Sequence, residues 1–300
     1  MEKLIGKAKV LIEALPYIRR FGGGAMVVKY GGAAMVAQDL RELFAQDVAL
    51  LKFVGIHPVV VHGGGPQIKA VLDRLGIESR FHDGLRVTDP QTLEVVEMVL
   101  GGPVNSGIVE LISRHGADAV GLTGKDGYLI EASKYMGPDG SGGVDYGLVG
   151  DVERVRPEIL GSLLNKFIPV IAPLGVDSGG VTYNINADTV AGRIAGALKA
   201  AKLMILTDQE GVLNPDGKLI RSLTASEAKK FIEDGTISGG MLPKVQCCLQ
   251  ALREGVGKAH IIDGRVEHCL LLEIFTTSGV GTEILPDIAH DTGAGDKSSE

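Results

Sequence analysis

The 300-residue chain is long enough for about two domains, and its 45% hydrophobic and 22% charged residues exclude intrinsic disorder and collagen-like architectures. The formal net charge of −7 opposes non-specific binding to nucleic acid or to an anionic membrane, and no apolar run approaches the 18 or so residues of a membrane span. The three cysteines have neither disulfide nor metal-binding spacing, and the first residues are not expected to be a secretory leader. We therefore expect a cytoplasmic protein.

The first twenty residues form a predicted helix that stands before the first strand. An apolar stripe recurs along it at intervals of four and three residues: Leu4, Ala8, Leu11, Leu15 and Ile18. Pro16 is expected to kink this helix. The stripe either packs on its own subunit or pairs with its copy in another subunit, and the pattern alone leaves both open.

Short runs rich in Val and Ile then alternate with longer segments of helical period, which predicts an α/β fold with a mainly parallel sheet between helices. Strands are expected over residues 25–30, 58–62, 118–123, 168–173, 202–207 and 259–263. Helices are expected over residues 39–54, 66–75, 90–100, 187–200, 224–233 and 242–254.

Two irregular regions suggest how the chain is divided. Between residues 125 and 155 the apolar period changes to two around a glycine-rich stretch, which predicts an appended hairpin. A lobe boundary is expected near residues 187–200, where a new strand and helix pattern begins. The expected organisation is a helix over residues 1–20, lobes over residues 21–190 and 191–290, and a disordered tail over residues 291–300.

Glycine clusters follow two of the predicted strands. Gly31 and Gly32 come after the first strand, and Gly63, Gly64 and Gly65 come after the second and open a helix. Backbone N–H groups at such positions bind anions, and the missing side chains allow a phosphate to come close. Because parallel strands end at the same edge of a sheet, both clusters are expected to face one polyanion, although tight turns alone would also use glycine.

Common nucleotide and hydrolase motifs are missing from the sequence. It contains no GxxxxGK[ST] loop, no GxGxxG fingerprint, no HExxH and no GxSxG. Instead, Lys29 ends the first strand, Lys244 follows Gly239 and Gly240, and Asp188 lies in YNINAD. Two lysines beside phosphate-cradling turns favour phosphoryl transfer, and Asp188 is expected to orient them, to cap a helix, or to do both.

Other single residues are weaker candidates. Arg86 in GLRVTD precedes a helix capped by Thr88 or Asp89, and it is either a carboxylate clamp or a surface ion pair. Thr207, Asp208 and Gly211 follow a strand, where they suit the ribose or the phosphates of a nucleotide, and their spacing does not decide between these.

Six motifs in order resemble the amino acid kinase family, and within it the branch that phosphorylates N-acetyl-L-glutamate. They are KYGGAAM, VVVHGGGPQI, GLRVTD, YNINADTVA, LTDQEGVL and GGMLPKV, and with the C-terminal stretch the resemblance covers residues 29 to 284. The resemblance implies an open αβα sandwich with the amino-acid substrate on the first lobe and ATP on the second. It also implies transfer from MgATP to the γ-carboxylate of N-acetyl-L-glutamate in arginine synthesis, with no protein metal site and no covalent intermediate.

The resemblance also implies roles for individual residues. Lys29 and Lys244 would stabilise the transferring phosphoryl group, Asp188 would organise the lysines, and Gly32 and Gly64 would donate backbone N–H groups. The implied substrate-binding residues are Gly64, Gly65, Arg86 and Asn184, and the nucleotide-binding residues are Thr207, Asp208, Gly211, Gly239, Gly240 and Met241.

The N-terminal helix and the stretch HCLLLEIFTTSGVGTEI resemble the arginine-inhibited members of the family. This implies a homohexamer built as a trimer of dimers through the N-terminal helices, and L-arginine as an effector. The implied effector residues are Tyr17, Lys218, His268, Glu273 and Gly279, with Glu273 facing the guanidinium. Some relatives bind a nitrogen-signalling regulatory protein, which is therefore a possible partner.

Two other classes of function stay open at this point. A dehydrogenase would need the dinucleotide fingerprint that is missing here. A catalytically silent nucleotide-sensing protein would keep the glycine loops but could dispense with Lys29, Asp188 or Lys244, all of which are present. Among kinases of the same family, aspartokinases and glutamate 5-kinases usually carry an appended domain, and uridylate kinases are shorter.

Overall fold

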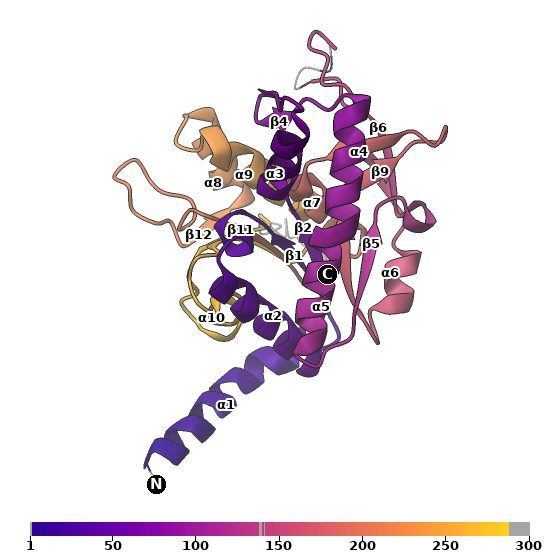
Figure 1. Ribbon diagram of the computed structural model, residues 1–300. Coiled ribbons are helices and arrows are strands. Elements are labelled where there is room, and N and C mark those ends of the chain that lie inside the picture. Colours follow the sequence, from indigo (N-terminus) through magenta and orange to yellow (C-terminus); the bar gives the residue numbers. More distant parts are fainter. Residues whose placement is uncertain (1, 138–139, 141, 288–300) are drawn as a thin grey trace, which may run out of the picture.

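A single central sheet organises the protein (Figure 1). The computed structural model describes residues 2–137, 140 and 142–287, and only the backbone at residues 2–4, 6–8, 10, 11 and 33. Eight strands lie in the order β12-β14-β13-β11-β1-β2-β8-β5, and within this sheet β13 and β14 form the antiparallel pair. The predicted α/β fold with a mainly parallel central sheet is confirmed, whereas the predicted tail over residues 291–300 lies outside the described residues.

All six predicted strands occur, and each matches its predicted bounds to within one residue. They are β1 (Ala25–Tyr30), β2 (His57–His62), β5 (Ala119–Thr123), β8 (Ile168–Ala172), β11 (Lys202–Thr207) and β13 (Lys258–Asp263). Two short strands, β12 (Ser222–Thr224) and β14 (Thr282–Leu285), complete one edge of the sheet. The central strands are nearly continuous in hydrophobicity because both of their faces are buried.

Each face of the sheet supports its own hydrophobic core. Val27 and Ile205 belong to the core that includes residues of α7 (Ala187–Ala197) and α9 (Leu242–Arg253). Val28 and Met204, their neighbours in the chain, belong to the core that includes α2 (Gln38–Phe53). The alternation of side chains along a strand thus produces the three-layered sandwich.

Three helices were not predicted from the sequence: α5 (Asn105–Arg114), α6 (Glu158–Leu163) and α10 (Cys269–Phe275). A stop was expected near Leu100, before Gly101, Gly102 and Pro103. Instead, a π-helical turn over Leu100–Val104 carries α4 (Pro90–Val99) into α5. The other predicted helices are present, including α3 (Gly65–Leu75) and α8 (Ala225–Glu233).

The combined helix Pro90–Arg114 is long and apolar enough to cross a membrane by length and composition alone. The sequence-based expectation that no run approaches this length is therefore wrong. Val96, Ile108 and Ile112 on this helix belong to the core on one face of the sheet. A core helix of this kind has the same composition as a membrane span.

A small second sheet includes Asn184, one of the predicted substrate-binding residues. The predicted hairpin is present as the antiparallel pair β6 (Ile130–Lys134) and β7 (Val149–Val155). It closes into a four-stranded barrel with β9 (Leu174–Val176) and β10 (Thr182–Ile185), which the sequence did not predict. β1 and β11 pair directly, so the central sheet is continuous across the expected boundary at residue 190, and the division into lobes stays a prediction.

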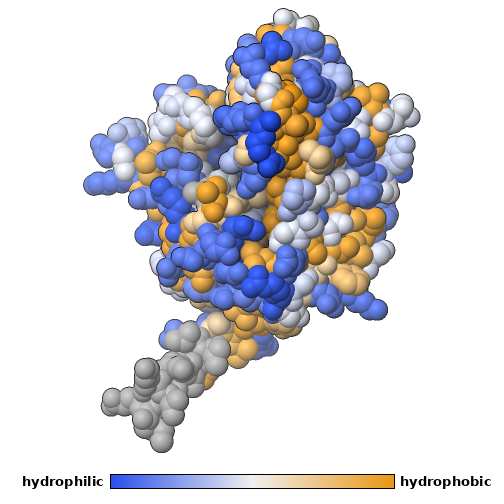
Figure 2. Space-filling model, viewed as in Figure 1, coloured by the Kyte–Doolittle hydropathy of each residue, from blue (hydrophilic) through white to orange (hydrophobic). Residues whose placement is uncertain are grey.

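Helix α1 (Glu2–Phe21) projects away from the body of the protein (Figure 1). Its last turns lie near α10, and apolar side chains are visible where it leaves the body (Figure 2). Leu15 of the predicted stripe is 50% exposed, and Ile12, outside the stripe, is 68% exposed, so these apolar side chains are not covered by their own chain. The helix continues through Pro16, and the side chains of Leu4, Ala8 and Leu11 lie outside the described residues.

Candidate active site

The two glycine-rich turns lie next to each other at the carboxyl ends of β1 and β2, as predicted. Tyr30 is paired with His62 in the parallel register, and the N–H of Gly63 donates to the Tyr30 carbonyl at 2.8 Å. Gly32 has a φ of +65°, which glycine adopts without strain, and begins a short 3-10 helix over Gly32–Met35. This edge therefore offers backbone N–H groups from two neighbouring loops.

Asp188 lies between two lysines in this region. Its Oδ1 is 3.0 Å from Nζ of Lys29, and its Oδ2 accepts a hydrogen bond from Nζ of Lys244 at 2.8 Å. Lys29 is on β1, Asp188 is in the first turn of α7 and Lys244 is in the first turn of α9. Three elements that are distant in sequence thus bring together the three charges that the sequence analysis had selected.

The structure decides between the two roles that the sequence allowed for Asp188. The cap of α7 is Asn186, whose side chain accepts from the N–H groups of Asp188 and Thr189. Asp188 is not the helix cap, so its carboxylate is available for the lysines. The approach of α7 to α9 depends on Gly192, where a Cβ would lie 2.6 Å from Sγ of Cys247.

The electrostatic balance of this trio favours a bound anion. Burial raises the pKa of Asp188, but Lys29 and Lys244 oppose it more strongly, and the pKa lies below its ordinary value. One carboxylate between two ammonium groups leaves a net positive charge. A Cβ at Gly31 would lie 2.6 Å from Nζ of Lys29, so a side chain at this position would displace the ammonium group.

Three cavities adjoin one another around Asp188. The first, of about 170 Å³, is lined by all four predicted substrate residues: Gly64, Gly65, Arg86 and Asn184. It shares Asn186 with a cavity of about 630 Å³ that contains Asp188 and Lys244. The second cavity shares Lys244 and Gly240 with a third, of about 470 Å³. The charged trio therefore stands between two separate binding spaces.

The smallest cavity is built to meet a carboxylate. Arg86 lies on β4 (Leu85–Arg86), which forms a hairpin with β3 (Phe81–His82), and it is 8% exposed. Its guanidinium donates to Oγ of Ser79 and to the Gly65 carbonyl, which fixes it beside the glycine loop. The following helix is capped by Asp89, which accepts from the N–H of Thr92 at 2.7 Å. Asn184 donates to Oγ1 of Thr88 at 3.1 Å.

The third cavity lies beyond the carboxyl end of β11. Thr207, Asp208, Gly211, Gly240 and Met241 line it, and Gly239 begins the adjoining 3-10 helix Gly239–Met241. An antiparallel β-bridge between Leu213 and Leu219 closes a hairpin that follows β11. The predicted nucleotide residues therefore lie on the side of Lys244 opposite to Arg86.

A separate cavity of about 480 Å³ lies between α1, α10 and the central sheet. Tyr17, Glu273 and Gly279 line it, so the structure brings together three of the five predicted effector residues. Lys218 and His268 are not among the lining residues. The backbone N–H of Lys218 donates to Oδ1 of Asn214 in the turn that follows β11, and Nδ1 of His268 lies 2.6 Å from Oδ1 of the buried Asp47. The structure does not bring these two residues to the cavity, and their role at an effector site stays a prediction.

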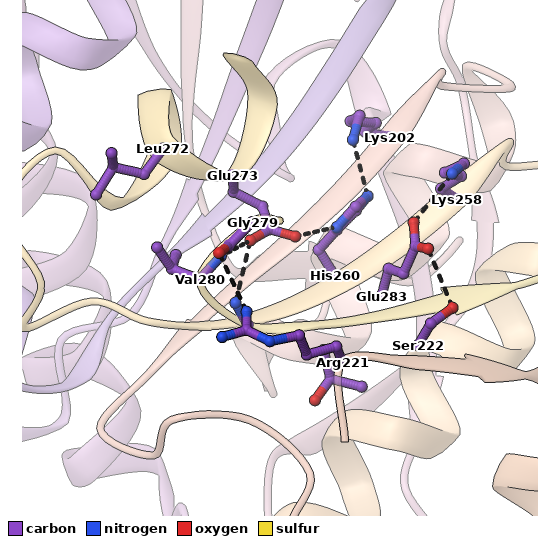
Figure 3. A network of polar contacts seen from close by, with 12 residues as sticks. Lys202, Arg221, Ser222, Lys258, His260, Leu272, Glu273, Gly279, Val280 and Glu283 are labelled. Carbon is purple, nitrogen blue, oxygen red and sulfur yellow. Dashed lines mark hydrogen bonds and ion pairs between the residues drawn. The ribbon is translucent and has the colours of Figure 1, made fainter. Parts of the chain in front are cut away.

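Lys202 and His260 belong to this cavity and were missed (Figure 3). Lys202 donates to Nε2 of His260 at 3.0 Å, and Nδ1 of His260 donates to Oε1 of Glu273 at 2.7 Å. The other oxygen of Glu273 accepts from the N–H groups of Val280 and Gly281. Their position inside apolar strands was the signal that could have identified Lys202 and His260, because a buried polar group needs a hydrogen-bonding partner.

Burial affects each member of this chain of contacts. It lowers the pKa of Lys202 to about 8 despite the opposing charge of Glu273, and it lowers the pKa of His260. Burial raises the pKa of Glu273, but the hydrogen bonds from His260 and Val280 outweigh it and bring the pKa below its ordinary value. Gly279 allows this geometry, because a Cβ there would lie 2.6 Å from Oε2 of Glu273.

An open αβα sandwich with two lysines around one carboxylate, beside glycine-rich strand ends, defines a phosphotransferase class of site. Comparison with known proteins agrees. The amino acid kinase family matches residues 25–263, and the acetylglutamate kinase of Syntrophobacter fumaroxidans is 60% identical over 289 residues, covering 94% of this chain and 97% of that protein. The chain belongs to the amino acid kinase family and, within it, to the acetylglutamate kinases, which confirms the family predicted from its motifs.

Solved structures add a second relationship. An N-acetylglutamate synthase from Neisseria gonorrhoeae, complexed with coenzyme A and N-acetyl-glutamate, matches with a TM-score of 0.80 and 28% identity. The match covers 93% of this chain but 63% of the synthase chain. The same synthase complexed with coenzyme A and L-arginine matches with a TM-score of 0.78 and 27% identity, covering 93% of this chain and 65% of that one.

Proposed function

We propose that the protein transfers the terminal phosphoryl group of ATP to the γ-carboxylate of N-acetyl-L-glutamate, which gives N-acetyl-L-glutamyl 5-phosphate and ADP. In the acetylated pathway this is the second step of arginine synthesis. The observation that carries the proposal is the position of Asp188 and its two lysines between a cavity lined by Arg86 and a cavity beyond β11. The names of the related kinases support the substrate.

Each charged residue has a role in this reaction. Arg86 holds the α-carboxylate, since its guanidinium is buried at the end of the small cavity and oriented by Ser79. Lys29 and Lys244 neutralise the charge of the phosphoryl group as it moves between the two substrates. Asp188 keeps both ammonium groups directed to the same point. The Gly32 and Gly64 N–H groups bind the transferring group from the glycine loops.

The reaction needs no general base, because the γ-carboxylate is already ionised at neutral pH. The transfer is a direct in-line displacement without a covalent enzyme intermediate. Within the described parts of the chain, no group of three or more His, Cys, Asp or Glu side chains is placed to hold a metal ion. We propose that Mg²⁺ enters with the phosphates of ATP, where it neutralises charge on the transferring group.

The test is ATP-dependent formation of acyl phosphate, trapped with hydroxylamine as the hydroxamate. N-acetyl-L-glutamate is compared with L-glutamate and L-aspartate at equal concentrations. Activity confined to N-acetyl-L-glutamate is expected, because the free amino group of the other two would place a positive charge where the acetyl group is accommodated. Activity with L-aspartate or L-glutamate instead would refute the substrate, and no activity with any of them would favour the nucleotide-sensing alternative.

We also propose that L-arginine inhibits the enzyme by binding in the cavity between α1 and α10. Its guanidinium would meet Glu273 and the carboxylate of Glu283, which also lines the cavity. The carboxylate of Glu273 accepts from His260 at Oε1 and from Val280 and Gly281 at Oε2, and because each oxygen can accept two hydrogen bonds, Oε1 can accept one more. A structural relative complexed with L-arginine supports this proposal.

Assembly into a homohexamer is part of the same proposal. The exposed apolar residues Ile5, Ile12 and Leu15 lie on a helix that projects from the body, and pairing with a second copy would cover them. Tyr17, Arg20 and Phe21 at the end of the same helix line the effector cavity. Arginine bound there would therefore influence the direction of α1 and the arrangement of the subunits.

A further inference from the structure

The proposed reaction leaves one buried polar pair without a role. His62 ends β2 immediately before the glycine loop and is fully buried, and Asn105 begins α5 and is 4% exposed. Nδ2 of Asn105 lies 3.1 Å from Nε2 of His62, and Nδ1 of His62 lies 2.8 Å from the Gly63 carbonyl. A buried polar pair costs free energy unless its hydrogen bonds are satisfied, so its contacts need an account.

The partners fix the proton positions in this pair. The Gly63 carbonyl can only accept, so Nδ1 of His62 carries a proton and donates it. The amide of Asn105 also donates to the carbonyls of Val170 at 2.9 Å and Leu122 at 3.3 Å, and Nε2 of the neutral His62 ring, which carries no proton, can only accept from it. Burial lowers the pKa of His62 to about 4, which agrees with the neutral ring that this arrangement requires.

The π-helical turn between α4 and α5 supports the glycine loop at a second point. A Cβ on Gly64 would lie 2.4 Å from Cδ2 of Leu100, so the π-helical turn Leu100–Val104 packs directly against this backbone. Asn105 follows that turn and reaches His62 because position 121 is glycine, where a Cβ would lie 2.0 Å from Oδ1 of Asn105. Leu100 therefore supports the loop at Gly64, and Asn105 supports it through His62.

The contacts to the loop are spread over its three glycines. The Gly63 carbonyl accepts from His62, Gly64 packs on Leu100, and the Gly65 carbonyl accepts from Arg86 at 3.2 Å. Gly64 has no side chain of its own to fix its orientation. Its N–H direction consequently depends on the residues on either side of it.

We propose that His62 and Asn105 are positioning residues that hold the Gly64 N–H toward the transferring phosphoryl group. The inference rests on the proposed function, because that function assigns the phosphoryl group to Gly64. His62 transfers no proton in this role, and its neutral ring links the bend between α4 and α5 to the loop. A small displacement of the Gly64 N–H weakens a contact that strengthens in the transition state, so it lowers kcat more than it raises KM.

The test compares two substitutions of His62 in the full-length protein. His62→Asn keeps a donor near the position of Nδ1 for Gly63 and breaks the link to Asn105, whereas His62→Gln keeps an acceptor near the position of Nε2 for Asn105. We expect His62→Asn to lower kcat by about 10- to 100-fold with KM for both substrates within about threefold. His62→Gln should recover a large part of that loss. His57→Asn, at the other end of β2, is the matched control and should match the original protein.

Hydrogen–deuterium exchange of the peptide containing residues 62–72 supplies a readout that needs no substrate. His62→Asn should increase exchange of the loop amides while His57→Asn should not, and circular dichroism confirms that each variant is folded. Equal exchange in all variants, or a loss of kcat explained entirely by a smaller folded fraction, would overturn the positioning role. If exchange responds but the original protein does not phosphorylate N-acetyl-L-glutamate, the positioning stands and the proposed substrate fails.

Discussion

Two clusters of lysine and carboxylate lie at opposite edges of the same central sheet, and they were not equally visible in the sequence. At the carboxyl ends of the strands, the sequence predicts a site with Lys29, Asp188 and Lys244, and the carboxylate of Asp188 lies within 3.0 Å of both ammonium groups. Near the amino ends, Lys202 and His260 were missed although they are more buried than Lys29 and Asp188. The first cluster is surrounded by glycines and helix starts, whereas the second lies inside apolar strands.

This difference shows what a sequence pattern can locate. A strand followed by a glycine turn places its last residues at a ligand-binding edge, whatever its partners are. A polar residue near the start of a buried strand gives no such indication, because its partner comes from an element whose position depends on the whole fold. Lys202 finds His260 on β13, and His260 finds Glu273 on α10, a helix that was not predicted.

The largest effect is expected from a substitution that disrupts the catalytic cluster. In Asp188→Asn the two ammonium groups of Lys29 and Lys244 face each other without a carboxylate between them, so they repel and lose their common direction. We expect kcat to fall by about 10³-fold in the hydroxamate assay, the size of effect seen when a preorganised transition-state contact is lost. Asp234→Asn, at the exposed end of α8, is the control. A fall of less than about tenfold would mean that Asp188 does not organise the lysines.

The second prediction concerns the other cluster. Glu273→Gln removes one of the two carboxylates proposed to meet the guanidinium, leaves Glu283, and keeps an acceptor for His260. We expect the arginine concentration for half-inhibition to rise by about 30-fold, because a buried contact between opposite charges becomes a neutral hydrogen bond. Inhibition is measured relative to the activity of each variant without arginine. Glu267→Gln, exposed just before α10, should respond like the original protein, and equal inhibition of both variants would exclude Glu273 as the guanidinium partner.

The elements of the fold show the same contrast: those with a clear local pattern were predicted from the sequence, and those that depend on the rest of the fold were not. The six main strands were predicted to within one residue because both of their faces are apolar. Helix α5 was missed because Gly101, Gly102 and Pro103 are typical of a helix end, yet a π-helical turn accommodates them. Helix α10 was missed because its seven residues are too short to establish a period.

Within the candidate site, the residues of the glycine turns could be predicted from the sequence, whereas the residues that support those turns by packing could not. Gly64 follows a strand and was selected, but its support by Leu100 joins two segments that only the folded chain brings together. His62, just before the loop, was not among the residues predicted to belong to the site. Its hydrogen bond to Asn105, 43 residues away, depends on the unpredicted bend that starts α5.

The third prediction tests whether α1 links the effector cluster to assembly. Ile12→Asp with Leu15→Asp places charges on the exposed apolar residues of the projecting helix and leaves Tyr17 and the central sheet unchanged. We expect light scattering to show dimers in place of hexamers, together with weaker inhibition by arginine. Deleting residues 1–20 should have the same effect on assembly. Glu13→Gln is the control, and hexamers that persist in the double variant would exclude α1 as the subunit contact.

The smallest expected effect comes from the charge on Lys202. Its pKa is lowered to about 8 by burial, whereas an unfolded lysine titrates near 10.5, so between these two pH values the unfolded chain binds more protons. Folding stability should therefore rise with pH across this window, and the buried charge costs about 3 kcal/mol at pH 7. In Lys202→Met the rise should be smaller, and Tm measured from pH 7 to 10 reports it. Lys230→Met, exposed on α8, should keep the original pH dependence. If Lys202→Met keeps it too, the cluster at the amino ends is solvated, and the contrast with the catalytic cluster is one of position rather than of buried charge.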